Sequence, residues 1–427
     1  MIDIKLHTPI GVKDCLPPEQ KRKQQVLRAV STLFASYGYE EVESPMFEYM
    51  EVFSDEKLGS TNPNDMFRFF DRTGNALALR SDLTPPIARI AATAYADKKG
   101  PLRFSYVGNA FRYSESYQGK LYEVSQAGVE LMGASSVEAD AEVIALAARS
   151  LQEAGLEEFR IHIGQVKFFR SVLEETGLSE EKKEQLKDLV AHRNYVGVEE
   201  MVEENEMPAA IKELFLQLPR LVGGEEVLKA AASLVESQDA KDALAEMKDL
   251  WEAIGDHGVQ EKTVFDLGMV NSLNYYTGII FRGYTYGTGY SVVDGGRYDH
   301  LVEQFGKQSP AVGFGMKVDA VLDALEYAHP GEETGGVDAL VAYHTGAKAK
   351  AFAIADAYRK KGMRMENSLL GDDFDANLQY MKERNIPSML FFQTETQLIY
   401  VRDAKELGFV ANEMAVSDLM GLDGEER

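Results

Sequence analysis

The feature that most constrains the fold is a long helical stretch between two segments rich in strand patterns. From about residue 167 to 258, apolar residues recur at helical spacing between acidic runs, and strand signals are few. Residues 103–133 before this stretch read as a long antiparallel pair, and strand patterns return from residue 263. We therefore expect a domain built on strands with a helical subdomain inserted at about 167–258.

A second boundary follows residue 325. The segment AHPGEETGG is rich in Pro, Gly and Glu, which is the composition of a linker. Strand and helix patterns alternate from there to the end, which predicts a small α/β domain with a parallel sheet. The expected domains are thus residues 1–328 and residues 336–427.

The charge of the chain argues against nucleic acid as a partner. The 427 residues carry 69 acidic and 45 basic side chains, a net charge of −24. Nucleic-acid binders neutralise phosphates with clustered Lys and Arg, and the basic runs here are short and mixed with acidic residues.

Membrane and secretory signals are also missing from the sequence. No apolar run approaches the ~20 residues of a membrane helix, and the first residues contain no apolar signal core. The single cysteine, Cys15, cannot form an internal disulfide. We expect no membrane association and a cytoplasmic location.

Common catalytic spacings are absent, and one polar constellation remains. There is no GxxxxGK[ST], HExxH, CxxC or GxSxG pattern, so the sequence predicts neither a cofactor nor a metal site. Gln126 and Glu130 lie four residues apart on an expected strand and so share a face. Carboxylates, amides and phenols of this kind suit a small zwitterion, but without further information internal hydrogen bonds and salt bridges are the favoured explanation. The set comprises Asp82, Thr84, Arg112, Gln126, Glu130, Tyr275 and Tyr276.

Six motifs in order resemble those of histidyl-tRNA synthetase. The segment YGYEEVESPMFE resembles class II motif 1, which ends at a proline of the dimer interface, here Pro45. The resemblance implies an α+β fold, a class II synthetase-like antiparallel sheet with flanking helices, and a homodimer through motif 1. Residues from about 336 resemble, more loosely, the anticodon-binding domain of that family. The other five motifs are GVKDCLPPE, LRSDLT, GNAFRYSESYQGKLYEVSQAGVELMG, VNSLNYYTGIIF and the segment from Val293 to Leu325, which resembles motif 3.

The resemblance also assigns roles within the polar constellation. Asp82, Thr84 and Gln126 fall where the family holds the α-amino group of histidine. Asp82 is one methylene shorter than the family's glutamate. Glu130 and Tyr276 fall where the family reads the imidazole ring.

Several positions depart from the synthetase pattern, and they concern the activation of histidine by ATP. Arg112 falls on the arginine that holds the α-phosphate, but Ala320 replaces the motif 3 arginine of the γ-phosphate. Asn271 replaces the histidine-specific arginine, and the motif 2 loop carries Glu115 with only Lys120 positive. Adenylation depends on preorganised cations, and removal of one such group typically costs about a hundredfold or more. The chain therefore resembles a synthetase that keeps a histidine pocket and has lost the means to activate histidine.

This combination is similar to the regulatory subunits of ATP phosphoribosyltransferase. The resemblance implies a non-catalytic subunit that assembles with the short-form catalytic subunit into a hetero-oligomer, a hetero-octamer in that family. It would activate the first step of histidine biosynthesis, mediate feedback inhibition by histidine and bind no tRNA. Residues 337–427 agree, with 15 acidic against 11 basic side chains, a net charge of −4. The alternatives are a divergent histidyl-tRNA synthetase, a paralogue that modifies another acceptor and a scaffold without a ligand.

Overall fold

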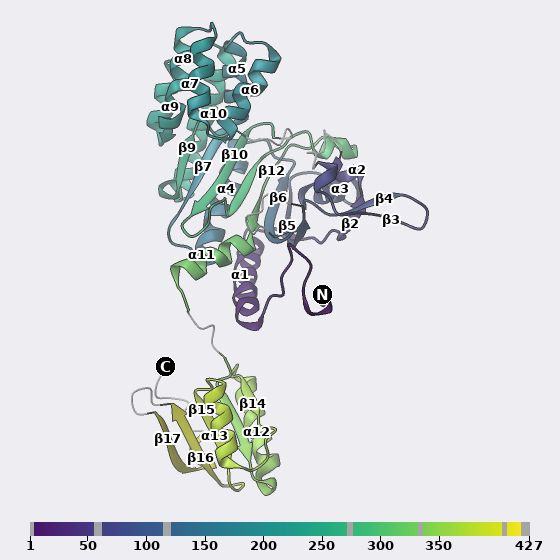
Figure 1. Cartoon of the computed structure of the whole chain (residues 1–427), viewed down its shortest axis with the longest axis vertical. Helices are drawn as coiled ribbons and strands as arrows, with labels where there is room; N and C mark the ends of the chain where they lie inside the picture. The colour runs from purple at the N-terminus through teal and green to yellow at the C-terminus, as the bar shows by residue number, and fades with distance from the viewer. Residues whose placement is uncertain are drawn as a thin grey trace. The chain divides into compact units, whose positions relative to one another are not determined.

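The computed structural model describes residues 4–54, 62–113, 121–270, 276–331, 336–403 and 408–419. The chain divides into two compact units, Met1–Gly331 and Glu332–Arg427. Each unit has its own sheet and core, and the first contains the inserted helices (Figure 1).

The first unit is organised around a nine-stranded mixed sheet with the order β1-β5-β6-β12-β11-β10-β7-β9-β8. Most neighbouring strands are antiparallel, which confirms the expected α+β synthetase-like sheet. Two pairs, β1 with β5 and β7 with β9, are parallel. The strands are β1 (Glu40–Glu41), β5 (Leu102–Phe111), β6 (Glu123–Met132), β7 (Phe159–Gln165), β8 (Val222–Gly223), β9 (Thr263–Asp266), β10 (Ile279–Thr285), β11 (Val293–Arg297) and β12 (Ala311–Lys317).

Helices cover both faces of this sheet because side chains alternate along its strands. On β6, Val129 points into the core beneath α1, α4 and α11, whereas Glu130 points to the opposite face. Helix α3 covers that opposite face, where Ile87 packs in a second core with Tyr106 of β5. The flanking elements are η1 (Ile4–Leu6), α1 (Pro17–Ser36), α3 (Thr84–Thr93), α4 (Val137–Glu153), η6 (Val302–Phe305) and α11 (Val318–Ala328).

The chain between β7 and β9 is mostly helical, as its apolar spacing predicts. Its helices form the teal group in Figure 1, and α10 packs on both α4 and α5. The sequence provides local start signals, because the Ser237 hydroxyl accepts a hydrogen bond from Ala240 N at the start of α10. The elements are α5 (Val166–Glu175), α6 (Glu180–Ala191), α7 (Tyr195–Glu204), α8 (Ala209–Gln217), η4 (Leu218–Arg220), α9 (Glu225–Ala232), α10 (Gln238–Asp256) and η5 (Gln260–Lys262).

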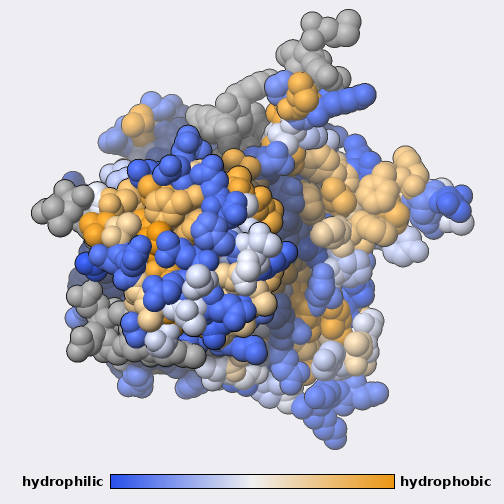
Figure 2. Space-filling view, turned by 90° about the horizontal axis from the view of Figure 1, so that it is seen from below, coloured by the Kyte–Doolittle hydropathy of each residue, from blue (hydrophilic) through white to orange (hydrophobic). Residues whose placement is uncertain are grey.

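A small three-stranded sheet extends from the first unit and exposes apolar side chains. Phe70 is 73% exposed and Phe47 is 51% exposed, and their sheet has the order β2-β4-β3. Figure 2 shows hydrophobic residues gathered over this region, at the right of the view. The elements are β2 (Phe47–Tyr49), α2 (Glu51–Ser54), η3 (Pro63–Asp65), β3 (Arg68–Phe70) and β4 (Ala76–Leu79).

The second unit is an α/β domain with a five-stranded sheet of order β14-β13-β15-β16-β17. The expected parallel sheet is correct for β14, β13 and β15, but β16 and β17 are antiparallel. The loop between β15 and β16 is too short for the crossover that a parallel pair needs. The elements are β13 (Ala339–Tyr343), η7 (Thr345–Ala347), α12 (Lys348–Lys360), β14 (Met365–Asn367), α13 (Phe374–Glu383), β15 (Ser388–Phe392), β16 (Gln397–Asp403) and β17 (Phe409–Ala415).

Across the part of the chain that the structure describes, none of the helices combines the length and apolar character needed to span a membrane.

Candidate functional site

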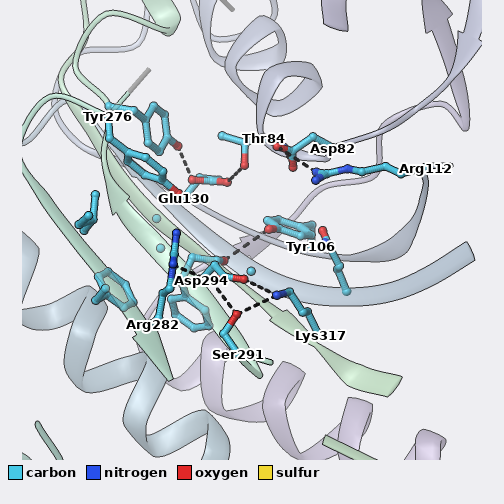
Figure 3. Close-up of a pocket in the computed structure, with 18 residues that line it drawn as sticks. Asp82, Thr84, Tyr106, Arg112, Glu130, Tyr276, Arg282, Ser291, Asp294 and Lys317 are labelled. Atoms are coloured by element: carbon cyan, nitrogen blue, oxygen red, sulfur yellow. Dashed lines mark hydrogen bonds and ion pairs between the residues drawn. The ribbon is translucent and has the colours of Figure 1, made fainter. Parts of the chain in front are cut away.

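A polar cavity of about 390 Å³ lies on the face of the nine-stranded sheet that α3 covers (Figure 3). Strands β5, β6, β10, β11 and β12 contribute its floor, and the start of α3 contributes its roof. We call it the first cavity. It brings together six of the seven predicted site residues, namely Asp82, Thr84, Arg112, Gln126, Glu130 and Tyr276.

Two positions singled out from the sequence, Tyr275 and Asn271, lie outside the described residues. The same holds for Glu115 and Lys120 of the motif 2 loop.

Glu130 occupies one end of the first cavity and is 1% exposed. Its Oε1 accepts a hydrogen bond from the Thr84 hydroxyl at 2.7 Å, and its Oε2 accepts one from Tyr298 OH. Figure 3 shows Tyr276 and Glu130 side by side at this end. Burial raises the pKa of Glu130 to about 8, although the two hydroxyl donors oppose this shift. A buried acceptor of this kind suits an N–H donor such as an imidazole.

Glycines open the floor of the cavity beside Glu130. Gly313 pairs with Glu130 across β12 and β6, and a Cβ at Gly313 would lie 1.8 Å from Glu130 Oε2. A Cβ at Gly296 of β11 would lie 2.7 Å from the Tyr276 ring. Larger residues at these positions would displace the side chains that form the pocket.

The start of α3 and the end of β5 supply the next group of polar side chains. Asp82 Oδ1 accepts a hydrogen bond from Leu83 N at 2.7 Å, which fixes its carboxylate at the mouth of the cavity. Arg112 donates to the Ser81 carbonyl and lies 3.7 Å from Asp82 Oδ2. Asp82 and Gln126 offer oxygen acceptors to a ligand ammonium.

Four further polar residues line the cavity, and sequence reasoning did not assign them to the site. Lys317 Nζ lies 2.5 Å from Asp294 Oδ2 and donates to Ser291 Oγ at 2.9 Å. The Ser291 hydroxyl donates to Asp294 Oδ1 at 2.8 Å, and Arg282 Nε lies 3.5 Å from the same oxygen. We call Arg282, Ser291, Asp294 and Lys317 the floor cluster. Strand register brings these residues together, because Arg282 pairs with Asp294 and Lys317 pairs with Gln126, and no local sequence pattern shows this register.

A second cavity of about 560 Å³ adjoins the first. The two share Arg112, Gln126 and Lys317 as lining residues. Ala320 lines the second cavity from α11 and is buried.

Carboxylates of the same helix also line the second cavity. Asp319 Oδ2 accepts a hydrogen bond from Ser125 N at 2.7 Å, and its Oδ1 lies 3.4 Å from Lys23 Nζ. Asp323 lies one helical turn further on, and burial raises its pKa. Two carboxylates, Asp319 and Asp323, therefore line the second cavity together with the cations Lys13, Arg112 and Lys317.

The described residues contain no cluster of three or more His, Cys, Asp or Glu that could hold a metal ion.

Comparison with known protein families places the chain among synthetase-like proteins. The family model for histidyl-tRNA synthetase matches residues 11–321. The ATP phosphoribosyltransferase regulatory subunit of Acetivibrio thermocellus is 43% identical over 391 residues, which cover 91% of this chain and 93% of that protein. The regulatory subunit of Ruminiclostridium cellulolyticum is 38% identical, and the match covers 94% of this chain and 95% of that protein.

Solved structures agree with the sequence comparison. A Bacillus halodurans protein described as an ATP phosphoribosyltransferase regulatory subunit/histidyl-tRNA synthetase superposes with a TM-score of 0.80 at 30% identity. The match covers 92% of this chain and 99% of that one. Histidyl-tRNA synthetase from Nostoc superposes with a TM-score of 0.82 at 20% identity, over 97% of this chain and 98% of that one, and shows the shared fold.

Proposed function

This chain belongs to the family of ATP phosphoribosyltransferase regulatory subunits, which are built on the histidyl-tRNA synthetase fold, and we propose that it binds histidine in the first cavity. We further propose that it assembles with the short-form catalytic subunit, activates it and transmits histidine inhibition to the first step of histidine biosynthesis. The subunit itself is non-catalytic. The observation that carries the proposal is the pairing of an amino-acid-sized polar pocket with an adjoining cavity in which Ala320 replaces the motif 3 arginine of the resembling synthetases.

The chemistry of the first cavity supports histidine as the ligand. Glu130 accepts an imidazole N–H at the buried end, where Tyr276 fixes the ring. Asp82, Thr84 and Gln126 receive the α-ammonium group nearer the mouth. The volume lies near the lower end of the ~300–1,000 Å³ that small-molecule sites occupy, which favours a ligand of this size.

The second cavity argues against the alternative of a divergent synthetase. Transfer of an adenylate group concentrates negative charge on phosphates, and preorganised cations lower the barrier. Here Ala320 contributes no charge. Lys13, Arg112 and Lys317 line the same cavity, but the neighbouring carboxylates of Asp319 and Asp323 offset their attraction for phosphates. The same argument disfavours a paralogue that activates another acid with ATP.

We propose that the subunit forms a homodimer through the small sheet and the adjacent motif 1 region. Met46, Phe47 and Tyr49 are each more than half exposed, and Phe70 of the same sheet is 73% exposed. Contiguous apolar surface of this kind marks interaction sites, and a closed two-fold dimer is the commonest oligomer. The second unit is proposed to be a degenerate anticodon-binding domain that binds no tRNA, because its net charge is negative.

The direct test is co-purification with a short-form catalytic subunit, followed by an assay of phosphoribosyl transfer. We expect a stable hetero-oligomer whose activity exceeds that of the catalytic subunit alone and falls when histidine is added. A catalytic subunit that neither binds this chain nor changes in activity would contradict the proposal.

A further inference from the structure

The floor cluster places two cations around one carboxylate beside the ligand pocket. Asp294 of β11 lies between Lys317 at the end of β12 and Arg282 of β10 (Figure 3). Ser291 bridges Lys317 and Asp294 through two hydrogen bonds. These contacts hold the Lys317 ammonium at the wall that the two cavities share.

The charges of the first cavity leave room for a ligand anion. Arg112 has Asp82 as its partner, whereas Arg282 and Lys317 share the single carboxylate of Asp294. The remaining carboxyl of the cavity, Glu130, keeps its proton at neutral pH because its burial raises its pKa to about 8. Within the floor cluster, two cations therefore lie beside one carboxylate.

The strand register sets the direction in which an amino acid would lie. Lys317 pairs with Gln126, and Glu130 lies four residues further along β6, which corresponds to about 13 Å of strand. A ligand whose imidazole contacts Glu130 and whose ammonium lies near Gln126 would direct its carboxylate to the Lys317 side.

We propose that Lys317, supported by Arg282, binds the carboxylate of the amino-acid ligand. The site would thereby select an amino acid over the amine that has the same side chain but no carboxylate. This inference rests on the proposed function of the first cavity. The Lys317 ammonium has three N–H donors, of which Ser291 and Asp294 engage two, and the ligand carboxylate accepts the third.

The test compares L-histidine with histamine, which has the imidazole and the ammonium but no carboxylate. Isothermal titration of the full chain should show tighter binding of histidine than of histamine. Lys317→Met should weaken histidine binding about ten- to hundredfold, because a hydrogen bond to a charged group is lost. Histamine should bind that variant as well as before or more tightly, since a repelling charge is gone. Lys317→Arg should keep most of the preference for histidine.

Glu130→Gln is the matched control at the other end of the ligand. It should weaken histidine and histamine alike, because both carry the imidazole. Unchanged histamine binding by the Lys317→Met variant would also show that its pocket is correctly folded. If Lys317→Met weakened the binding of both ligands equally, or left histidine binding unchanged, the proposed role of Lys317 would be wrong. The proposal that the first cavity binds histidine would not be affected by that result. If the wild-type chain bound neither ligand, the proposed function itself would fail, and this inference with it.

Discussion

The Glu130→Gln substitution should make the stability of the first unit less dependent on pH. Buried Glu130 has its pKa raised from 4.5 to about 8, so between these values the folded chain holds a proton that the unfolded chain releases. Unfolding then releases a proton, and the stability of the wild-type protein falls as pH rises through this window. Glutamine has no proton to lose and can still hydrogen-bond to Thr84 and Tyr298, its partners in the wild type.

The magnitude follows from the two pKa values. Each pH unit within the window changes the free energy of unfolding by about 1.4 kcal/mol for one proton. Between pH 5.5 and pH 8.5 the variant should gain about 3 kcal/mol relative to the wild type, because the folded pKa of Glu130 lies at about 8. Other titrating groups, such as Asp140 with its pKa raised to about 6 by burial, are present in both proteins and cancel in the difference.

Urea unfolding followed by tryptophan fluorescence measures this difference. The single tryptophan, Trp251, lies in α10 of the first unit, so its signal does not report the second unit. Unfolding curves of both proteins at the two pH values and one protein concentration give the required free energies. A difference between variant and wild type that stayed constant from pH 5.5 to pH 8.5 would refute the buried, protonated state of Glu130.

Three further predictions follow from the cavities and the small sheet. Gly313→Ala should abolish histidine binding, because its Cβ would lie 1.8 Å from the Glu130 carboxylate. The control is Gly289→Ala, whose Cβ would meet nothing within 4 Å, and equal histidine binding by the two variants in titration would count against the pocket. The chain alone should show no histidine-dependent ATP–pyrophosphate exchange, because Ala320 and acidic neighbours line the second cavity, and exchange above background would argue for a synthetase. Replacing exposed Phe47 and Phe70 together by serine should convert a dimer into a monomer in light scattering, and an unchanged mass would exclude the small sheet as the interface.

The sequence predicted the parts of the site that lie on one strand. Alternation along β6 placed Gln126 and Glu130 on one face, and both line the first cavity. Their hydrogen-bond partners were harder to predict. Tyr298 lies 168 residues away from Glu130 in the chain, and only the pairing of β6 with β12 and of β12 with β11 brings them together.

The floor cluster shows the same limit. Lys317 stands at the junction of a strand and a helix, where the sequence indicates a helix start and gives no partner for the ammonium. Asp294 and Arg282 lie on two other strands, and their approach depends on a register that periodicity does not determine.

The sequence predicted which helices and strands form better than it predicted whether neighbouring strands run parallel or antiparallel. Helical spacing identified the inserted helices, and the synthetase-like motifs indicated the sheet. Strands β7 and β9 pair in parallel on either side of the insertion, which local patterns could not reveal. In the second unit, the short connection between β15 and β16 was a usable signal for an antiparallel pair.

The most direct test of the account is histidine inhibition of the assembled complex with wild-type or Glu130→Gln regulatory subunit. A hydrogen bond between neutral groups is worth about 0.5–1.5 kcal/mol, so the histidine concentration for half-inhibition should rise about two- to tenfold. Activation of the catalytic subunit should remain, because it depends on assembly and the substitution lies inside the pocket. Histidine inhibits only if it binds the less active state more tightly, so weaker binding must shift the curve. An unchanged half-inhibition concentration in an intact complex would contradict the account and place the regulatory histidine elsewhere.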